Sequence, residues 1–517
     1  MPRIPSPLLV VVAVAEPDGR AEQVLTLDSG GALRGPDGAG ADRSGTDPGV
    51  DATALDRLGA TGKAGEVHRL PDGRWLLGIG AADAAAARRA GAALSGALHG
   101  RADRADAAGS DAAGSDAVSP DTAGSDAAGP LVGLGVAGLP EEVHEALVIG
   151  LVLGSHRFRV SRTQPPPPGR VQLVAGAGEL DRLVDQVRSG TELAAATALA
   201  RDLASTPSDV KSPTWLVETA AGLAGQVPGL TATVWRHDRL VEEGFGGMLA
   251  VGGGSSRPPA LLRLDWAPPG GVPADPRHLV LVGKGITFDT GGISIKPADG
   301  MHLMRTDMAG GAAVIGAVLA VARLGLAVRV TALVPAAENH VSGSAYRPGD
   351  IVRHYDGTTT EVVNTDAEGR MVLADALGYA VRELAPDLIV DAATLTGAMK
   401  VSLGLRTGGL FATDDELSDA LVEAGTRTGE RWWRMPLLDH VDDEVPSEIA
   451  DIRQAPPGPG AIGAAQFLRR FTGGLPWVHL DIAGPARCEK PYDEVASGAT
   501  GFAARTMVEL ARGLAGR

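Results

Sequence analysis

The second half of the 517-residue chain alternates short apolar runs with longer helix-forming segments, and this alternation constrains the fold most strongly. Short apolar runs bounded by turn residues are typical of buried strands, whereas longer periodic segments are typical of helices. Strands that alternate with helices predict an α/β domain with a mostly parallel central sheet. The predicted strands lie near Leu279 and at 328–334, 388–392 and 477–482, and the predicted helices at 312–324, 371–384 and 500–514.

The chain is long enough for more than one domain. We predict an N-terminal α/β domain over residues 1–170, a connecting helix at 171–205, and a larger C-terminal α/β domain over 206–517 that carries the candidate site. Within the first domain, residues 101–130 repeat Ala-Gly-Ser-Asp units with almost nothing to bury. That composition cannot offset the entropy of ordering, so it predicts a disordered insertion.

Charge and cysteine content restrict the possible partners and compartment. The chain has 47 basic and 63 acidic residues and a net charge of −16, which disfavours nonspecific binding to nucleic acid or anionic membranes. Cys488 is the single cysteine, so an intrachain disulfide is impossible. The apolar run at 8–15 is too short to span a bilayer and predicts a strand, and the apolar stretch at 310–334, interrupted by arginines, predicts a buried helix followed by a strand. We expect a soluble cytoplasmic protein.

The first polar cluster spans residues 283–297, directly after the predicted strand near Leu279, and contains Lys284, Asp289 and Lys296. A strand that ends in a glycine-rich turn places polar residues at the carboxyl edge of a sheet, where open α/β folds bind ligands. A phosphate-binding loop is the obvious alternative, but the glycine and lysine spacing does not fit its pattern. A second glycine-rich stretch at 133–138 resembles a dinucleotide fingerprint but lacks the acidic residue expected downstream, so we predict a tight strand-to-helix turn there.

The second polar cluster, residues 364–370, places Asp366, Glu368 and Arg370 within five positions, just before a predicted helix. Asp366 and Glu368 are two residues apart, so in an extended segment both side chains project to one side. Neighbouring carboxylates repel each other unless cations neutralise them, and hard divalent metals prefer oxygen ligands. By itself the run is also compatible with a simple helix start, and the metal interpretation depends on its pairing with the first cluster.

Together these segments resemble the leucine aminopeptidase (cytosol aminopeptidase) family over roughly residues 200–517, whereas the N-terminal part resembles the family's variable domain only loosely. The segments that carry the resemblance are Val282–Pro297, Met304–Ala313, Glu338-Asn339, Tyr346–Asp350, Asn364–Ala376, Ala393–Ala398 and His479–Gly484.

The resemblance implies a metallopeptidase site and assigns its residues. The implied ligands of two neighbouring divalent ions, Mn²⁺ or Zn²⁺, are Lys284, Asp289, Asp307, Asp366 and Glu368. Lys296 and Arg370 are the implied catalytic pair, with Arg370 holding a bicarbonate ion that shuttles a proton. The resemblance also implies peptide substrates with a free N-terminus, a preference for Leu-like first residues, and a homohexamer. The residues that match the family's pocket for the first side chain are Met304, Thr394, Leu395, Gly397, Ala483 and Ala486.

Elementary chemistry is consistent with these assignments. Two divalent ions carry about four positive charges, which the four implied carboxylates would balance in a buried site. Lys284 can bind a metal only as the free amine, so we expect its pKa to be lowered by burial and by the adjacent metals. Lys296 would stabilise the oxyanion formed during peptide hydrolysis.

Two other functions remain open from the sequence. An oligomeric binding scaffold with an accessory DNA role is disfavoured by the net charge, and a two-metal phosphoesterase would use similar carboxylates. For Asp375, which lies a little over one helical turn beyond Arg370, we expect a structural role.

Overall fold

The computed structural model describes residues 10–15, 21–28, 33–34, 40–41, 52–111, 131–161, 169–268 and 277–516. These residues form two compact units. The first consists of 2–198 with 490–496, and the second of 199–489 with 497–517 and the first residue. The chain passes from one unit to the other within the long helix α4 (Leu180–Ser205), which lies inside the segment 171–205 predicted as a connecting helix, whereas residues 171–174 of that segment belong to a strand.

The N-terminal unit is built on a mixed sheet whose main path runs β1-β8-β7-β2-β3-β4, with β6 pairing with both β2 and β5. The strands are β1 (Val10–Val14), β2 (Glu22–Asp28), β3 (Leu33–Arg34), β4 (Gly40–Ala41), β5 (Val67–Arg69), β6 (Trp75–Gly80), β7 (Leu131–Gly135) and β8 (Arg170–Val174). The helices are α1 (Ala52–Leu58), α2 (Ala84–Asp111) and α3 (Glu141–Ser155), and α2 packs on α3. Small residues allow this contact, because a Cβ on Gly150 would lie 2.1 Å from the carbonyl oxygen of Arg88.

Three predictions concern this unit. The apolar run at 8–15 contains β1, as expected for a strand. The glycine-rich stretch at 133–138 joins β7 to α3, which confirms the tight strand-to-helix turn. The predicted disordered insertion begins inside α2, which continues to Asp111, and the rest of it, 112–130, lies outside the described residues.

The second unit contains a nine-stranded sheet in the order β18-β17-β20-β16-β11-β13-β10-β9, with β12 paired to β13. Its strands are β9 (Leu230–Trp235), β10 (Ala260–Trp266), β11 (His278–Gly283), β12 (Gly285–Asp289), β13 (Arg329–Asn339), β16 (Leu388–Ala393), β17 (Thr407–Ala412), β18 (Arg431–Arg434) and β20 (Trp477–Asp481). The four central strands β13, β11, β16 and β20 run parallel, and antiparallel strands β10 and β17 flank them. The predicted α/β class with a mostly parallel sheet is confirmed.

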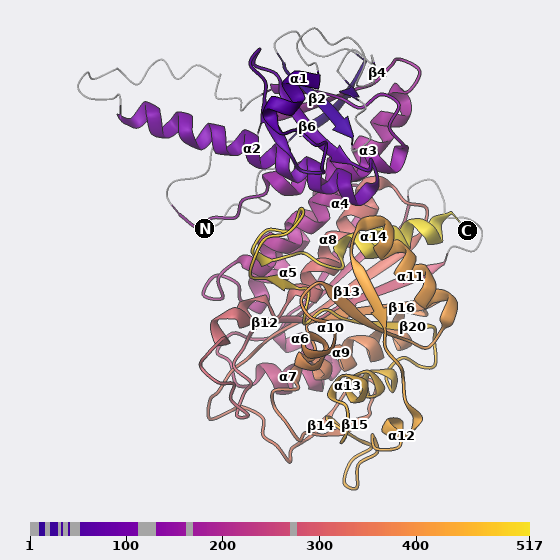
Figure 1. The fold of residues 1–517 in the computed structure, drawn as a ribbon. Helices are drawn as coiled ribbons and strands as arrows, with labels where there is room; N and C mark the ends of the chain where they lie inside the picture. Colours follow the sequence, from indigo (N-terminus) through magenta and orange to yellow (C-terminus); the bar gives the residue numbers. More distant parts are fainter. Residues whose placement is uncertain are drawn as a thin grey trace. The chain divides into compact units, whose positions relative to one another are not determined.

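Helices cover both faces of this sheet, and Figure 1 shows α8 and α14 on one side of it and α7, α9 and α13 on the other. The helices are α5 (Pro213–Ala224), α6 (His237–Glu243), α7 (Gly246–Gly252), α8 (Ala309–Leu324), α9 (Glu368–Tyr379), α10 (Gly397–Leu403), α11 (Asp415–Thr428), α12 (Asp439–Asp442), α13 (Gly460–Arg469) and α14 (Ala504–Ala515). A 3₁₀ turn, Met301–Thr306, precedes α8, and a π turn, Ala380–Leu384, follows α9. There are also two small sheets among the described residues. One contains β14 (Ile351–Arg353), β15 (Thr359–Glu361) and β19 (Ile452–Arg453), and the other pairs β21 (Arg487–Cys488) with β22 (Gly498–Ala499).

The central strands are apolar because both faces are covered: every residue of β11 and β16 is buried. Helix α8 is also buried almost all round. Together with the preceding turn it forms a segment, Met301–Leu324, that is long and apolar enough to cross a membrane, but 89% of its most apolar stretch is buried inside the protein. This segment is therefore the core helix that the sequence predicts at 312–324, followed as expected by strand β13.

Glycine backbone, rather than side chains, fills the contact between the start of α8 and strands β11 and β16. A Cβ on Gly310 would lie 2.0 Å from the carbonyl oxygen of Ala392, and one on Gly283 would lie 2.5 Å from the Cα of Gly311. An added Cβ at either position would clash with buried backbone atoms, which cannot rotate away as a side chain can. This close approach fixes where α8 begins relative to the sheet.

We therefore expect Gly310→Ala to destabilise the protein by about 3 kcal/mol, because overpacking against backbone forces the helix away from the strand. Gly222→Ala in α5 is the matched control, since a Cβ there meets nothing within 4 Å. The control should raise stability slightly through helix propensity. Thermal unfolding followed by fluorescence measures both, and equal melting temperatures for the two variants would contradict the close contact.

Candidate active site

Lys284 lies at the carboxyl end of β11 and forms the centre of a buried ionic group. Its Nζ is 2.8 Å from Asp307 Oδ2 and 2.7 Å from Glu368 Oε1, and it donates to the Thr394 carbonyl at 3.1 Å. Its side chain is only 3% exposed. Asp307 reaches this position because it lies between the 3₁₀ turn and α8, where Thr394 Oγ1 donates to Asp307 Oδ1 at 2.8 Å. Residues that are distant in the sequence thus converge on the Lys284 amine.

Asp289 and Lys296 form the second ionic group, just after β12. Lys296 Nζ lies 2.8 Å from Asp289 Oδ2 and also pairs with Asp366. Asp289 Oδ1 accepts hydrogen bonds from the Gly291 amide and from Asn339 Nδ2, both at 2.8 Å. These donors hold one oxygen of the carboxylate in place and leave the other directed at the cluster.

Thr365 ties the two predicted polar clusters to each other. Its hydroxyl donates to the Gly291 carbonyl at 2.7 Å and accepts from the Ser294 amide at 2.8 Å. Gly291 and Gly292 adopt positive φ angles of 85° and 64°, and a Cβ on Gly292 would lie 2.9 Å from Thr365 Oγ1. Glycine is therefore required at this turn for both conformation and space. The carbonyl of Thr365 in turn accepts from Asn339 Nδ2 at 3.0 Å and from the Tyr346 hydroxyl at 2.9 Å.

The carboxylates of Asp289, Asp366 and Glu368 converge, with one oxygen from each lying within 4.8 Å of the others. Glu368 begins α9, and its Oε2 is buried with no hydrogen-bond partner among the described residues. A buried carboxylate oxygen without a partner is costly, and a divalent cation is the group that satisfies oxygens arranged in this way. The donor set therefore fits metal ions. Lys284, Asp289, Lys296, Asp307, Asp366 and Glu368 all line one cavity of about 280 Å³.

Burial and charge oppose each other at this cluster. Burial raises the pKa of the Asp307 carboxyl well above its usual range, and the Lys284 ammonium offsets this only in part. The sequence predicts a lowered pKa for Lys284, and burial does act in that direction. In the protein without metal, however, the carboxylates of Asp307, Glu368 and Asp289 outweigh burial and raise the pKa of Lys284. The carboxylates thus hold a proton on Lys284 unless other cations neutralise them.

Arg370 is buried beside the cavity rather than in its lining. Its Nη1 donates to the Gln454 carbonyl at 2.8 Å, whereas its Nε is buried without a partner within the described ranges. Burial, opposed by the charges of Glu368 and Asp481, lowers the pKa of Arg370 to about 10. The guanidinium therefore remains charged at neutral pH and retains one donor for a small anion.

The same cavity contains the residues expected to surround the first side chain of a substrate. These are Met304, Thr394, Leu395, Gly397, Ala483 and Ala486. By contrast, Asp375 lies outside its lining and is fully buried. Its carboxylate accepts from the amides of Met248 and Tyr355 and from His354 Nδ1, at distances of 2.8–3.1 Å. Three buried or partly buried donors from elsewhere in the chain support the structural role expected for Asp375.

Several residues of the site are not assigned by sequence reasoning. Asn339 holds the Asp289 carboxylate, Tyr346 holds the Thr365 carbonyl, and the Gln454 carbonyl holds Arg370. None of these three supporting residues lines the cavity. Asp481 accepts from the Leu395 and Thr396 amides and so fixes the loop after β16. A strand-terminal acid such as Asp481 is a usable signal, since it falls at the same sheet edge as Lys284.

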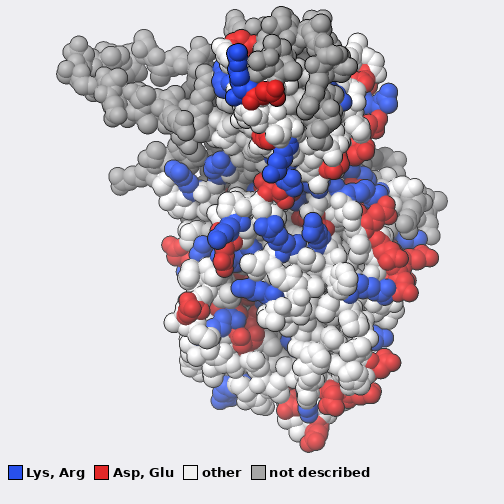
Figure 2. All heavy atoms as spheres, viewed as in Figure 1, with Lys and Arg blue, Asp and Glu red and all other residues white. Residues whose placement is uncertain are grey.

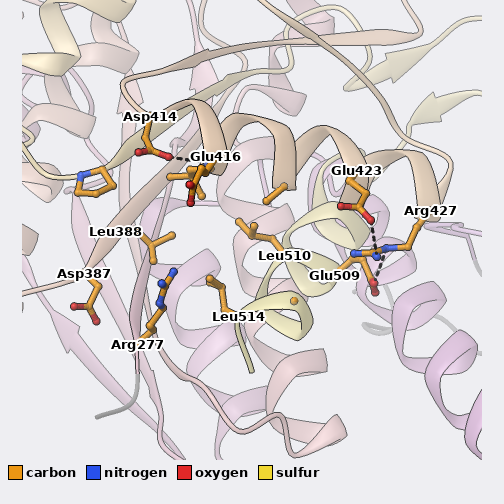
Figure 3. A pocket seen from close by; sticks show the side chains of 14 residues that line it. Arg277, Asp387, Leu388, Asp414, Glu416, Glu423, Arg427, Glu509, Leu510 and Leu514 are labelled. Carbon is orange, nitrogen blue, oxygen red and sulfur yellow. Dashed lines mark hydrogen bonds and ion pairs between the residues drawn. The ribbon is translucent and has the colours of Figure 1, made fainter. Parts of the chain in front are cut away.

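A second cavity, of about 370 Å³, lies at the opposite ends of the parallel strands (Figure 3). Its lining includes Arg277, Leu388 and Pro476, which immediately precede or begin β11, β16 and β20. Figure 3 shows the carboxylates of Glu423 and Glu509 paired with Arg427 on the far side. Ligands of open α/β folds bind at the carboxyl edge. The cavity around Lys284 is therefore the candidate active site.

Gly369 provides a test of how tightly this site is packed, because a Cβ there would lie 2.5 Å from Lys284 Cε. The group that must move is a flexible side chain, so we expect Gly369→Ala to leave the melting temperature nearly unchanged. The displaced amine should nevertheless reduce bound metal and peptidase rate at least about tenfold, the size of effect seen when supporting groups of metal sites are lost. Metal content per chain and rate measure this, with Gly513→Ala in α14 as control. Equal values for the two variants would contradict the packing.

The chain has clear relatives. The catalytic-domain profile of the cytosol aminopeptidase family matches residues 198–508. A probable cytosol aminopeptidase of Syntrophotalea carbinolica is 46% identical over 382 residues, covering 72% of this chain and 76% of the relative. Another, from Roseiflexus castenholzii, is 46% identical over 380 residues, covering 72% and 77%. Among solved structures, the bottromycin maturation enzyme BotP in complex with Mn superposes with a TM-score of 0.76 and 38% identity, covering 91% of this chain and 98% of that chain.

An α/β fold with carboxylates and lysines gathered at the carboxyl edge of its parallel sheet is the architecture of a metal-dependent hydrolase. The matched residues cover the whole of that site. The chain belongs to the cytosol aminopeptidase family. It is a leucyl aminopeptidase-type hydrolase that uses divalent metal and acts on peptides, and the resemblance found in the sequence is confirmed.

Proposed function

We propose that this enzyme releases the first residue of peptides at a centre of two divalent ions. The ligands would be Lys284, Asp289, Asp307, Asp366 and Glu368. The observation that carries the proposal is the convergence of three carboxylates within 4.8 Å, one of which has a buried oxygen without a partner. Two ions account for the donor set better than one, because Asp307 contacts Lys284 but is not one of the three converging carboxylates. Mn²⁺ or Zn²⁺ would fit, and the solved BotP structure contains Mn.

The bound ions would supply Lewis acidity toward the peptide carbonyl and promote the ionisation of water. The protein's own residues do the rest. Lys296 lines the cavity, and its ammonium would donate to the oxyanion of the tetrahedral intermediate. Arg370 would hold a bicarbonate ion through its free Nε, to serve as proton acceptor. Asn339 and Thr365 would keep the carboxylates oriented through each step.

The substrate's first side chain would lie among Met304, Leu395 and Ala483, since these residues share the cavity with the carboxylates. Two of them are apolar and bulky and the third leaves room, so the subsite favours a Leu-like residue over a charged one. We further propose a cytoplasmic location, in keeping with the names of the relatives, and a homohexameric assembly, which mass photometry would test.

The proposal is tested with leucyl p-nitroanilide before and after EDTA treatment, followed by addition of Mn²⁺ or Zn²⁺. We expect EDTA to remove at least about 99% of the activity and either metal to restore it, because water attack depends on the ions. Metal analysis of the restored enzyme should give two ions per chain. Activity indifferent to metal would refute the proposal, and turnover of a phosphate ester instead of the anilide would favour a phosphoesterase.

A further inference from the structure

The cavity around Lys284 is lined by charges of both signs. Its lining carries the carboxylates of Asp289, Asp307, Asp366 and Glu368, with which Lys284 and Lys296 pair. It also carries two cations that belong to neither ionic group, Lys400 and Arg487, and the acid Glu489. A molecule held in the cavity would therefore be exposed both to the carboxylates and to these two cations.

Arg487, one of these two cations, has a donor without a hydrogen-bond partner among the described residues. The residue begins the short strand β21, whose backbone pairs with β22, and its side chain is partly buried. Its Nη1 is buried and has no hydrogen-bond partner in the described part of the chain. Burial and the nearby positive charge of Arg305 lower the pKa of Arg487, and Glu489 compensates only weakly. The guanidinium therefore keeps a buried N–H donor that no described acceptor satisfies.

The chemistry of this donor selects its ligand. A guanidinium presents two parallel N–H groups that match a carboxylate in a bidentate arrangement, which a single ammonium cannot do. Lys400 lies in α10, is exposed, and forms no ion pair with an acid among the described residues. Its ammonium would add long-range attraction for the same negative charge.

We propose that Arg487, assisted by Lys400, binds a carboxylate of the substrate beyond the bond that is cleaved. This inference rests on the proposed function, because it places the substrate's amine at the carboxylate cluster. It narrows the substrate class to short peptides whose second or third residue carries a carboxylate. That carboxylate is either the free C-terminus or an acidic side chain, and the two sources are separable by experiment.

The test compares kcat/KM for Leu-Gly and Leu-Gly-Gly with the values for their C-terminal amides, in the Mn²⁺-restored enzyme. We expect the parent to prefer at least one free acid by about tenfold or more, the usual size for a charge-assisted pair. Arg487→Gln should bring this acid-to-amide ratio close to one, and Lys400→Gln should lower it less. Leu-Asp-amide against Leu-Asn-amide tests the acidic side chain in the same way.

The control is Arg431→Gln, which removes an exposed arginine of β18 outside this cavity and should leave every ratio unchanged. Metal content and melting temperature show that the variants remain folded. A parent enzyme without preference for any carboxylate, or an Arg487→Gln variant that keeps the preference, overturns the inference. If the restored enzyme fails to cleave leucyl p-nitroanilide at all, the proposed function fails instead.

Discussion

Glu368→Gln is expected to lower kcat/KM for leucyl p-nitroanilide by about a thousandfold or more, the scale of loss when a charge-stabilising group is removed from an active site. Glu368 contributes one oxygen to Lys284 at 2.7 Å and directs the other, unpaired, into the cluster. The amide keeps the shape of the side chain but replaces a charged ligand oxygen with a donor that repels cations. Bound metal should fall together with the rate.

Metal content per chain, measured beside the rate, separates this explanation from unfolding. Glu338→Gln is a matched control, because Glu338 is also buried but is held by Ser255 and Arg257 and has no place in the cluster. Its rate should stay within about threefold of the parent, as for a substitution outside the reacting centre. A Glu368→Gln variant with full metal content and full rate would contradict the proposed set of metal ligands.

Lys296→Met should lower kcat by about a hundred- to a thousandfold, with a smaller change in KM, because the ammonium acts mainly on charge that develops in the transition state. Lys296 pairs with Asp289 and Asp366, so its loss also removes a competitor for those carboxylates. Metal content should therefore be retained, in contrast to Glu368→Gln.

Steady-state kinetics with metal analysis distinguishes the two roles of Lys296. The variant Lys296→Arg keeps the positive charge and should retain more rate than Lys296→Met, although the larger fork cannot reproduce the geometry of an ammonium. If Lys296→Met instead loses its metal while the rate per bound ion is unchanged, Lys296 supports the ligands and takes no part in the reaction.

The fold and the local parts of the site could be predicted from sequence because they depend on neighbouring residues. The strands end where the apolar runs end, and Asp366 and Glu368 lie two residues apart before a helix that the sequence also predicts. Predicted boundaries differ by a few residues. Helix α14 begins at Ala504 rather than near 500, after Ala503 adopts a left-handed φ of 79°. Helix α9 begins three residues early because Glu368 itself starts the first turn.

The supporting contacts could not be predicted, since they join segments whose distance apart is set only by the folded chain. Thr365 reaches Gly291 across 74 positions, and Arg370 reaches Gln454 across 84. The free donor of Arg487 is a property of what surrounds it rather than of any motif. Such positions look like ordinary loop residues until the topology brings them together.

Charges are distributed unevenly outside the cavity. On the face shown in Figure 2, acidic side chains gather where Figure 1 places α11, which carries Asp415, Glu416, Asp419 and Glu423. Lysine and arginine side chains lie across the middle of the same face, so the face carries both signs, and it is the net charge of −16 that disfavours a nucleic acid partner.

The glycine contact beneath α8 has a consequence for how the enzyme responds to heat. Asp307 lies two residues before that helix, and the backbone contacts of Gly310 and Gly311 with the ends of β16 and β11 fix where the main chain of Asp307 lies relative to that of Lys284. The main chain that carries the proposed ligands cannot shift without breaking this contact, so on heating the metal-loaded parent enzyme we expect loss of metal and unfolding of the sheet at the same temperature.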